Sequence, residues 1–187
     1  MLKLNARQLR TTEPDREVVK GIKKNPIYII LDNVLDTYNV GAIFRLCDAA
    51  AARKIYLCGA TETPPNPKIK KASVSTWKWV DWEYAETAVS AIARLKAQNS
   101  QLKTDSPQAE KFKIVAVEQG KGSIDIKNFK PTYPLALVVG NETYGVSQEV
   151  LKIVDEIVEL PMFGVNKSLN CMVACGIVLY KILELKN

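Results

Sequence analysis

Short runs of apolar residues recur along this chain, and polar or glycine-containing turns separate them. Runs of about five apolar residues without alternation are typical of strands that are buried on both faces of a sheet. The pattern predicts five strands, at residues 27–31, 54–58, 113–118, 135–139 and 157–160.

Helical patterns lie between these runs and after the last of them. We expect helices from about Asn39 through the alanine-rich residues 48–52, over residues 84–98, from about Ser147, and over residues 169–185. The last of these is predicted to be largely buried, through Val173, Gly176, Ile177, Tyr180 and Leu183.

Strands that alternate with helices predict an α/β fold, with a mainly parallel sheet and helices on both faces. Three segments do not follow the alternation. Residues 63–67 contain three prolines and predict an exposed loop, and residues 99–110 predict a polar connector. Residues 68–80 fit a short helix or a loop equally well.

The chain shows no shift in composition that would separate two domains. We therefore expect a single domain at residues 26–187, preceded by a basic N-terminal segment at residues 1–25. The apolar stretches are far shorter than a membrane span, and the first residues have no apolar signal core. These features predict a cytoplasmic protein that does not act at a membrane.

Cysteine and histidine usage argues against a metal site. The chain contains no histidine, and none of its four cysteines forms a C-x-x-C pair: Cys47, Cys58, Cys171 and Cys175. The usual zinc-site patterns are therefore missing, and no bound metal is predicted. We interpret the cysteines as small buried thiols in a reducing compartment.

The formal net charge of +6 is unevenly distributed along the chain. Residues 1–25 carry seven Lys and Arg against three acids, whereas residues 135–187 carry four Lys against six acids. Between residues 66 and 80, lysines with no acid among them alternate with tryptophans: Lys68, Lys70, Lys71, Trp77, Lys78 and Trp79. This pattern suits an RNA backbone with stackable bases, and it suits equally a solvated lysine face with tryptophans in the core.

The first of three candidate site segments runs from Asn39 to Arg45, with the sequence Asn-Val-Gly-Ala-Ile-Phe-Arg. Asn39 can cap a helix, and Gly41 lets another chain segment come close. The planar guanidinium of Arg45 suits a phosphate or a ribose oxygen. The alternative is a surface arginine that is paired with Asp48.

The second segment is the glycine-framed turn at residues 140–147, directly after an apolar run. Such a turn between a strand and a helix holds backbone N–H groups near a polar ligand. Its spacing imitates a phosphate-binding P-loop, but Val146 stands where that motif requires a lysine. Binding of a nucleoside triphosphate, and with it a P-loop hydrolase, is therefore not expected. An ordinary strand–helix connection remains the alternative.

The third segment, residues 160–170, follows the last predicted strand. Pro161 and Gly164 shape a loop, and Ser168 and Asn170 stand at the start of a helix, where free N–H groups can grip a ligand. Simple capping of the helix by Ser168 is the alternative.

In this order and with these spacings, the three segments resemble the motifs of the SpoU (TrmH-type) RNA methyltransferases of the SPOUT superfamily. The likeness runs from about Pro26 to Leu183. It implies a C-terminal trefoil knot, S-adenosylmethionine as cofactor, and a homodimer with active sites near the subunit interface. The implied reaction is methyl transfer to a ribose 2′-hydroxyl of tRNA or rRNA. An RNA-binding module of the same fold without turnover is the alternative.

The resemblance also implies roles for individual residues. Those lining the cofactor pocket would be Val117, Gly140, Leu160, Ser168 and Asn170. Asn39, Arg45 and Glu142 would form the catalytic group that faces the ribose and its phosphate. Contacts to RNA are expected from Arg45, Lys68, Lys70, Lys71 and Trp77.

With no histidine in the chain, the commonest general base is excluded. Because arginine stays protonated in proteins, we expect Arg45 to hold the phosphate and stabilise the developing alkoxide. Asn39 would orient the hydroxyl, and the proton would leave through the phosphate, Glu142 or water.

Overall fold

The computed structural model describes residues 3–101 and 111–186, and within them it contains one seven-stranded, fully parallel sheet. The order across the sheet is β3-β2-β1-β6-β4-β7-β5. The strands are β1 (Asn25–Asp32), β2 (Ala52–Cys58), β3 (Trp82–Ala85), β4 (Lys113–Val117), β5 (Ile124–Asp125), β6 (Leu135–Gly140) and β7 (Glu156–Glu159).

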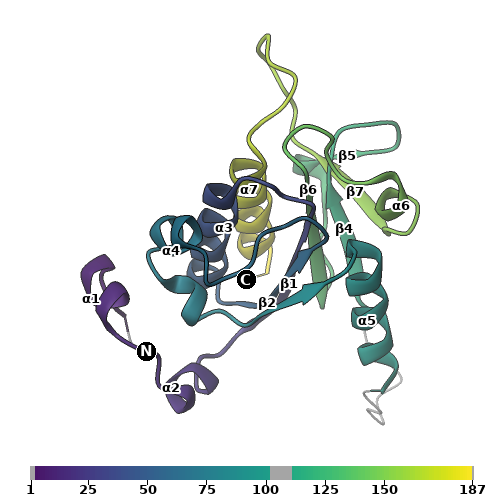
Figure 1. The fold of residues 1–187 in the computed structure, drawn as a ribbon. Coiled ribbons are helices and arrows are strands. Elements are labelled where there is room, and N and C mark those ends of the chain that lie inside the picture. Colours follow the sequence, from purple (N-terminus) through teal and green to yellow (C-terminus); the bar gives the residue numbers. More distant parts are fainter. Residues whose placement is uncertain (1–2, 102–110, 187) are drawn as a thin grey trace.

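Helices cover both faces of this sheet (Figure 1). On one face α3 (Thr37–Ala49) and α7 (Cys171–Glu184) pack on the central strands, and α4 (Pro67–Ser73) packs on α3. On the other face lie α5 (Ala88–Gln101) and the short α6 (Gln148–Leu151). Two 3₁₀ turns, Thr76–Lys78 and Ile126–Asn128, complete the domain. The predicted α/β fold with a mainly parallel sheet is confirmed.

All five predicted strands are present, but β3 and β5 were not predicted. Both are short edge strands that carry no long apolar run, so the hydrophobic pattern does not mark them. The helix expected over residues 84–98 was placed too early, because Trp82–Ala85 pairs with β2 as a strand. The predicted connector at 99–110 begins later than expected, since α5 extends to Gln101, and residues 102–110 lie outside the described part.

The structure also shows which parts of residues 63–80 are helical and which are loop. Pro67 starts α4, so it belongs to a helix and not to the preceding loop. Pro64 is buried, which corrects the expectation of a wholly exposed loop. Residues 68–80 combine the rest of α4 with a 3₁₀ turn.

The last helix is present, but its predicted buried side is only partly correct, since Gly176 and Leu183 are half-buried and the other three named residues are exposed. Cys175, Val178, Leu179 and Ile182 face the core, whereas Val173, Ile177 and Tyr180 are 39%, 45% and 51% exposed. Because α7 is apolar almost all round, its periodicity does not select a face. The buried side is set by where α3 and the sheet lie.

The start of α3 differs from the prediction as well. Asp36 caps the helix by accepting a hydrogen bond from the N–H of Tyr38, so Asn39 lies inside the first turn and does not cap it. Gly41 allows the close approach that was expected of it. A Cβ atom there would lie 2.6 Å from the Cβ of Ala72 in α4.

The N-terminal segment forms two short helices, α1 (Ala6–Thr11) and α2 (Arg16–Lys20), which lie at the edge of the domain (Figure 1). It is tied to the domain by an ion pair between Glu13 and Lys78. Its separation from the domain at residue 25 stays a prediction. Among the described helices, none has the length and apolar character that crossing a bilayer requires.

Candidate functional site

The three candidate segments meet at the carboxyl ends of the central strands. In the sheet Asp32, the last residue of β1, is paired with Gly140, the last of β6, and Val117 at the end of β4 lies beside Val139. The loops that leave β4 and β6 surround a cavity of about 450 Å³, together with the loop before α7 and its first turn. Ligands bind at this edge in open parallel α/β sheets.

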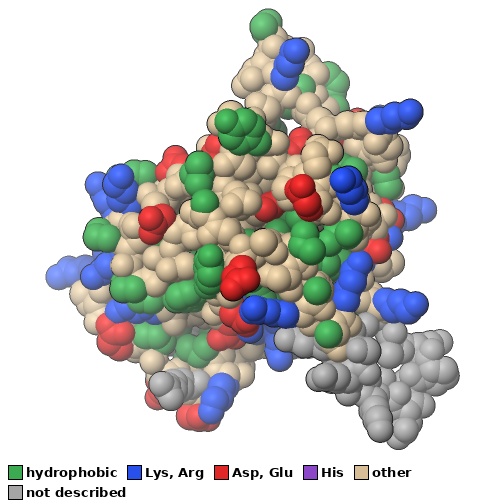
Figure 2. All heavy atoms as spheres, turned by 45° about the vertical axis from the view of Figure 1, so that its right-hand side comes forward, with side chains coloured by type: hydrophobic (Ala, Val, Ile, Leu, Met, Phe, Trp, Pro, Cys, Tyr) green, Lys and Arg blue, Asp and Glu red, His purple; other side chains and the backbone are tan. Residues whose placement is uncertain are grey.

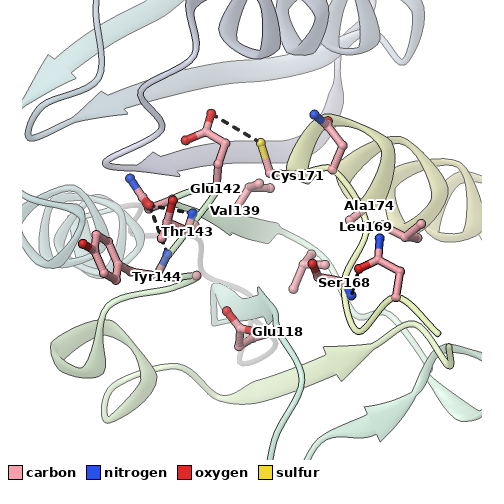
Figure 3. A pocket seen from close by; sticks show the side chains of 15 residues that line it. Glu118, Val139, Glu142, Thr143, Tyr144, Ser168, Leu169, Cys171 and Ala174 are labelled. Carbon is pink, nitrogen blue, oxygen red and sulfur yellow. Dashed lines mark hydrogen bonds between the residues drawn. The ribbon is translucent and has the colours of Figure 1, made fainter.

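Figure 3 shows the side chains around this cavity. Thr143 and Tyr144 come from the glycine turn, Glu118 from the end of β4, and Ser168 and Ala174 from the last loop and helix. Segments that lie far apart in the sequence therefore build one site.

A ladder of side-chain hydrogen bonds joins the three segments. The amide of Asn170 donates to Asn39 Oδ1 at 3.0 Å, and the amide of Asn39 donates to Glu142 Oε1 at 2.9 Å. Glu142 also accepts from the backbone N–H groups of Leu35 and Asp36, each at 3.0 Å. Each of the three segments thus contributes one side chain, Asn39, Glu142 or Asn170, to these hydrogen bonds. The bonds from Leu35 and Asp36 also hold the loop after β1 against the glycine turn.

These contacts set the protonation state of Glu142. Burial raises the pKa of its carboxyl group, but the hydrogen bonds from Asn39 and from the N–H groups of Leu35 and Asp36 outweigh it and leave the pKa below its ordinary value. Glu142 is therefore an anion at neutral pH with both oxygens engaged, which makes it a weak proton acceptor.

The thiol of Cys171 lies beside this carboxylate, 3.9 Å from Glu142 Oε1. Burial, and after it the negative charge of Glu142, raises the pKa of Cys171 to about 12. Since the thiolate is the nucleophilic form, burial beside this carboxylate disfavours Cys171 as a nucleophile.

The glycine turn uses its own backbone groups. Asn141 and Gly145 exchange two backbone hydrogen bonds of 2.9 Å, and Asn141 Oδ1 accepts from the N–H groups of Thr143 and Tyr144 at 2.8 and 3.1 Å. The amide of Asn141 in turn donates to the carbonyl of Asn33 at 2.8 Å. The turn is therefore rigid, and these N–H groups are not available to a ligand.

Two carboxylates accept hydrogen bonds from the backbone N–H groups at the end of the turn. Glu118 accepts from the N–H of Val146 at 2.8 Å, and the buried Asp32 accepts from the N–H of Ser147 at 2.9 Å. Gly145, at φ 70°, leaves room for Glu118, whose Oε2 would lie 2.0 Å from a Cβ atom there. In a P-loop such N–H groups hold phosphate, so the carboxylates give a second reason against that function.

Asn170 caps α7 by accepting from the N–H groups of Met172 and Val173. Capping by Ser168, the alternative reading of this segment, is therefore not observed. Ser168 lines the cavity from the exposed loop before the helix, which projects from the domain (Figure 1).

The predicted cofactor residues lie together. Val117, Gly140, Ser168 and Asn170 line the large cavity, and Leu160 lines an adjoining one of about 100 Å³ that shares Val117 and Ser168 with it. Their contacts with a cofactor remain predictions.

Sequence reasoning missed Glu118, Asp32 and Asn141. The first two are acids at the ends of apolar runs, on the side of the sheet where parallel strands place their ligands, and that signal was available.

The predicted catalytic residues do not all lie at the cavity. Asn39 is buried and Glu142 lines the cavity, whereas Arg45 is exposed and does not line it. Six residues of helix place Arg45 about 9 Å along the axis from Asn39 and about 120° around it. Within the described residues Arg45 forms no ion pair, so the pairing with Asp48 is not observed.

The predicted RNA contacts are in part accessible. Lys68, Lys70 and Lys71 are exposed on α4, where the last two also face the negative end of the helix dipole. Trp77 is half-buried and packs against the core. On the face shown in Figure 2, Lys and Arg side chains are scattered among acidic ones and form no continuous basic patch. RNA binding by these residues stays a prediction.

In the parts of the chain that the structure describes, no group of His, Cys, Asp and Glu side chains is arranged to hold a metal ion.

Comparison with known proteins gives the family. Residues 26–180 match the SpoU rRNA Methylase family. A tRNA (guanosine(18)-2′-O)-methyltransferase of Aquifex aeolicus is 34% identical over 172 residues, which are 89% of this chain and 72% of that relative.

Solved structures agree. The A. aeolicus TrmH/SpoU tRNA modifying enzyme has a TM-score of 0.74 at 31% identity, over 97% of this chain and 82% of that one. An AdoMet-bound rRNA methyltransferase from Sinorhizobium meliloti has a TM-score of 0.72 at 26% identity, over 94% of this chain and 59% of that one. The matched range contains all three site segments, and the chain belongs to the SpoU rRNA methylase family.

Proposed function

We propose that this protein transfers a methyl group from S-adenosylmethionine to a ribose 2′-hydroxyl of tRNA or rRNA. The observation that carries the proposal is the chain of hydrogen bonds from Asn170 through Asn39 to Glu142, which joins the three family segments beside a cavity that the second and third of them line. Relatives named as tRNA and rRNA 2′-O-methyltransferases support the reaction type.

The cavity suits this cofactor in size and charge. Its volume of about 450 Å³ is typical of a small-molecule site. The charged side chains that line it are the carboxylates of Glu118 and Glu142, which favour a sulfonium cation and disfavour a polyphosphate. The backbone N–H groups of Leu169 and Asn170 have no acceptor among the described residues and can bind polar atoms of the ligand.

The cofactor, when bound, supplies a methyl group that is already activated by the positive sulfur. The protein's task is therefore alignment and charge stabilisation. Asn39 has its carbonyl oxygen bonded to Asn170 and its amide to Glu142, so its orientation is fixed. We assign Asn39 and Glu142 the role of holding the loop after β1 against the glycine turn.

The remaining tasks, accepting the proton and holding the phosphate, fall to the RNA or water and to Arg45. The engaged oxygens and lowered pKa of Glu142 make it a poor base, so the proton leaves to an RNA phosphate or to water. Arg45, exposed and unpaired among the described residues, is free to hold that phosphate next to the reacting sugar.

We further propose that two copies of the chain associate through α7. Val173, Ile177 and Tyr180 are exposed apolar residues spaced four and three apart, and Leu169 extends their stripe. The stripe starts beside the cavity, so a dimer formed on it would bring the second subunit close to the site.

The trefoil knot and the cytoplasmic location are also part of the proposal. The chain crosses from β7 through the loop at residues 160–170 to reach α7, which packs on α3 and β6, and this path supports a knotted C-terminus. A tRNA or rRNA substrate supports a location in the cytoplasm.

The reaction type can be tested with bulk RNA. The protein is incubated with RNA and methyl-labelled cofactor, and the product is digested with alkali. Because a 2′-O-methyl group blocks cleavage at its own linkage, the label is expected in alkali-resistant dinucleotides. Label confined to mononucleotides would mean base methylation and would refute the proposal.

A second experiment distinguishes the methyltransferase from an RNA-binding module without turnover. Calorimetry with the cofactor alone is expected to show binding. RNA binding without any heat from the cofactor would favour the non-catalytic module.

A further inference from the structure

Tyr144 is an aromatic residue on the glycine turn that is 87% exposed although it lines the 450 Å³ cavity. Among the described residues its ring has no aromatic, cationic or hydrogen-bonding partner. Exposed tyrosine is common on proteins, but a ring at the rim of a ligand cavity is placed to contact what binds there.

The backbone beneath this ring is held firmly. The N–H of Tyr144 donates to Asn141 Oδ1 at 3.1 Å, and the flanking Asn141 and Gly145 exchange two backbone hydrogen bonds. The ring therefore projects from a rigid base, and a ligand that stacks on it needs little ordering of the turn.

The position of Tyr144 relative to the cavity indicates its ligand. In Figure 3 it lies across the cavity from Ser168, Leu169 and Ala174. A ribose that receives a methyl group must reach the cavity mouth, and its base then lies beside the rim. A flat aromatic ring that has no partner within the protein matches the flat face of a nucleobase.

We propose that Tyr144 stacks on a base of the RNA substrate, at or next to the nucleotide that is methylated. This inference rests on the proposed function and deepens it. Stacking on an aromatic ring tolerates any base, so Tyr144 positions the strand and leaves the choice of sequence to other contacts. A protein partner is the less favoured ligand, since the apolar stripe proposed for association lies on α7 and not on this turn.

The test uses Tyr144→Phe, which keeps the ring, and Tyr144→Leu, which removes it and keeps an apolar side chain. Tyr84→Leu is the matched control, because Tyr84 is an exposed tyrosine that does not line the cavity. For each protein, fluorescence anisotropy measures affinity for a labelled total tRNA fraction and a total rRNA fraction. Calorimetry measures cofactor affinity, steady-state kinetics give kcat and KM for RNA, and sedimentation gives the oligomeric state.

Loss of one stacked base is expected to weaken RNA affinity and raise KM for RNA by about 5- to 150-fold in Tyr144→Leu. We expect kcat at saturating RNA and cofactor affinity to change little, and Tyr144→Phe and Tyr84→Leu to resemble the wild type. Unchanged RNA affinity in Tyr144→Leu would overturn the inference. So would an equal loss in Tyr144→Phe, which would point to the hydroxyl, or a changed oligomeric state, which would point to a protein contact.

The two proposals fail separately in this experiment. A wild-type protein that transfers no methyl group would refute the proposed function, while the RNA affinities of the Tyr144 series would still report on the ring. Normal methyl transfer with an unaltered KM in Tyr144→Leu would refute the stacking role alone.

Discussion

Replacement of Glu142 by glutamine tests whether this residue fastens the site together. In the structure the carboxylate accepts three hydrogen bonds, from Leu35 N–H, Asp36 N–H and the Asn39 amide, at 3.0, 3.0 and 2.9 Å. Hydrogen bonds to a charged group contribute about 1.5–3 kcal/mol each. We use the lower end of that range, because the residue is exposed and water competes for it.

Glutamine is isosteric, so only part of this interaction is lost. Its single carbonyl oxygen can keep the bonds from Asp36 and Asn39, which both reach Oε1, but its amide group then faces the N–H of Leu35. We expect a loss of about 1.5 kcal/mol for Glu142→Gln, which loses one of the three bonds, and about 4.5 kcal/mol for Glu142→Ala, which loses all three. For a chain of this size these losses lower the melting temperature by about 3–6 °C and about 9–18 °C.

The stability difference between wild type and Glu142→Gln should depend on pH, which a difference in packing alone would not produce. The folded state lowers the pKa of Glu142 below its ordinary value of 4.5. Stability from the carboxylate is therefore complete above that unfolded-state value and is lost as the pH falls through the lower folded-state pKa. Glutamine does not titrate, so the gap in melting temperature between wild type and Glu142→Gln should narrow below about pH 4.5.

Thermal melts followed by circular dichroism between about pH 7 and about pH 3.5 measure this gap. Glu62→Gln is the control, because the exposed Glu62 has no hydrogen bond or ion pair to any described residue. Equal melting temperatures for Glu142→Gln and wild type at neutral pH would refute the reasoning. A gap that stays constant down to low pH would also refute it, since the carboxylate charge would then contribute nothing.

Three further predictions follow from the geometry. Arg45→Ala should lower methyl transfer by about 10²–10³-fold with cofactor affinity in calorimetry unchanged, and wild-type turnover would remove Arg45 from the reaction. Ile177→Lys should shift the sedimentation coefficient to that of a monomer, whereas Val18→Lys, at an exposed apolar residue on α2, should not. Gly41→Ala should destabilise the fold by about 1–3 kcal/mol in denaturant titrations, since its Cβ would lie 2.6 Å from that of Ala72, and an unchanged midpoint would mean that α4 yields freely.

The interior of the fold was predictable because its strands are buried on both faces. Every residue of β6 is buried, and so are the last four residues of β1, so their apolar runs are long enough to be recognised. The edge strand β3 has only one fully buried residue, Ala85, and its composition matches a helix as well as a strand. Pairing with β2, a contact between distant segments, decides its structure.

The composition of the site was predictable from the three segments, but its hydrogen bonding was not. Asn39 was expected to cap α3, and instead its side chain lies between Asn170 and Glu142. That role depends on partners more than 100 residues away, at separations of 131 and 103 positions, which no local pattern encodes. The exposed side of α7 escaped prediction for a related reason, because the face of an apolar helix depends on what packs against it.

The glycine turn shows that one sequence pattern can form part of a site for an anion or part of a site for a cation. Its spacing is that of a phosphate-binding loop, in which backbone N–H groups face an anion. Here carboxylates of the protein, Glu118 and Asp32, already occupy the N–H groups of Val146 and Ser147. A phosphate would have to displace these carboxylates and would be repelled by them, whereas a sulfonium cation is attracted by the remaining negative charge. The missing lysine at Val146 and the acids at the ends of β1 and β4 therefore have one consequence: they convert a loop shaped for a polyphosphate into one side of a cavity for a cationic methyl donor.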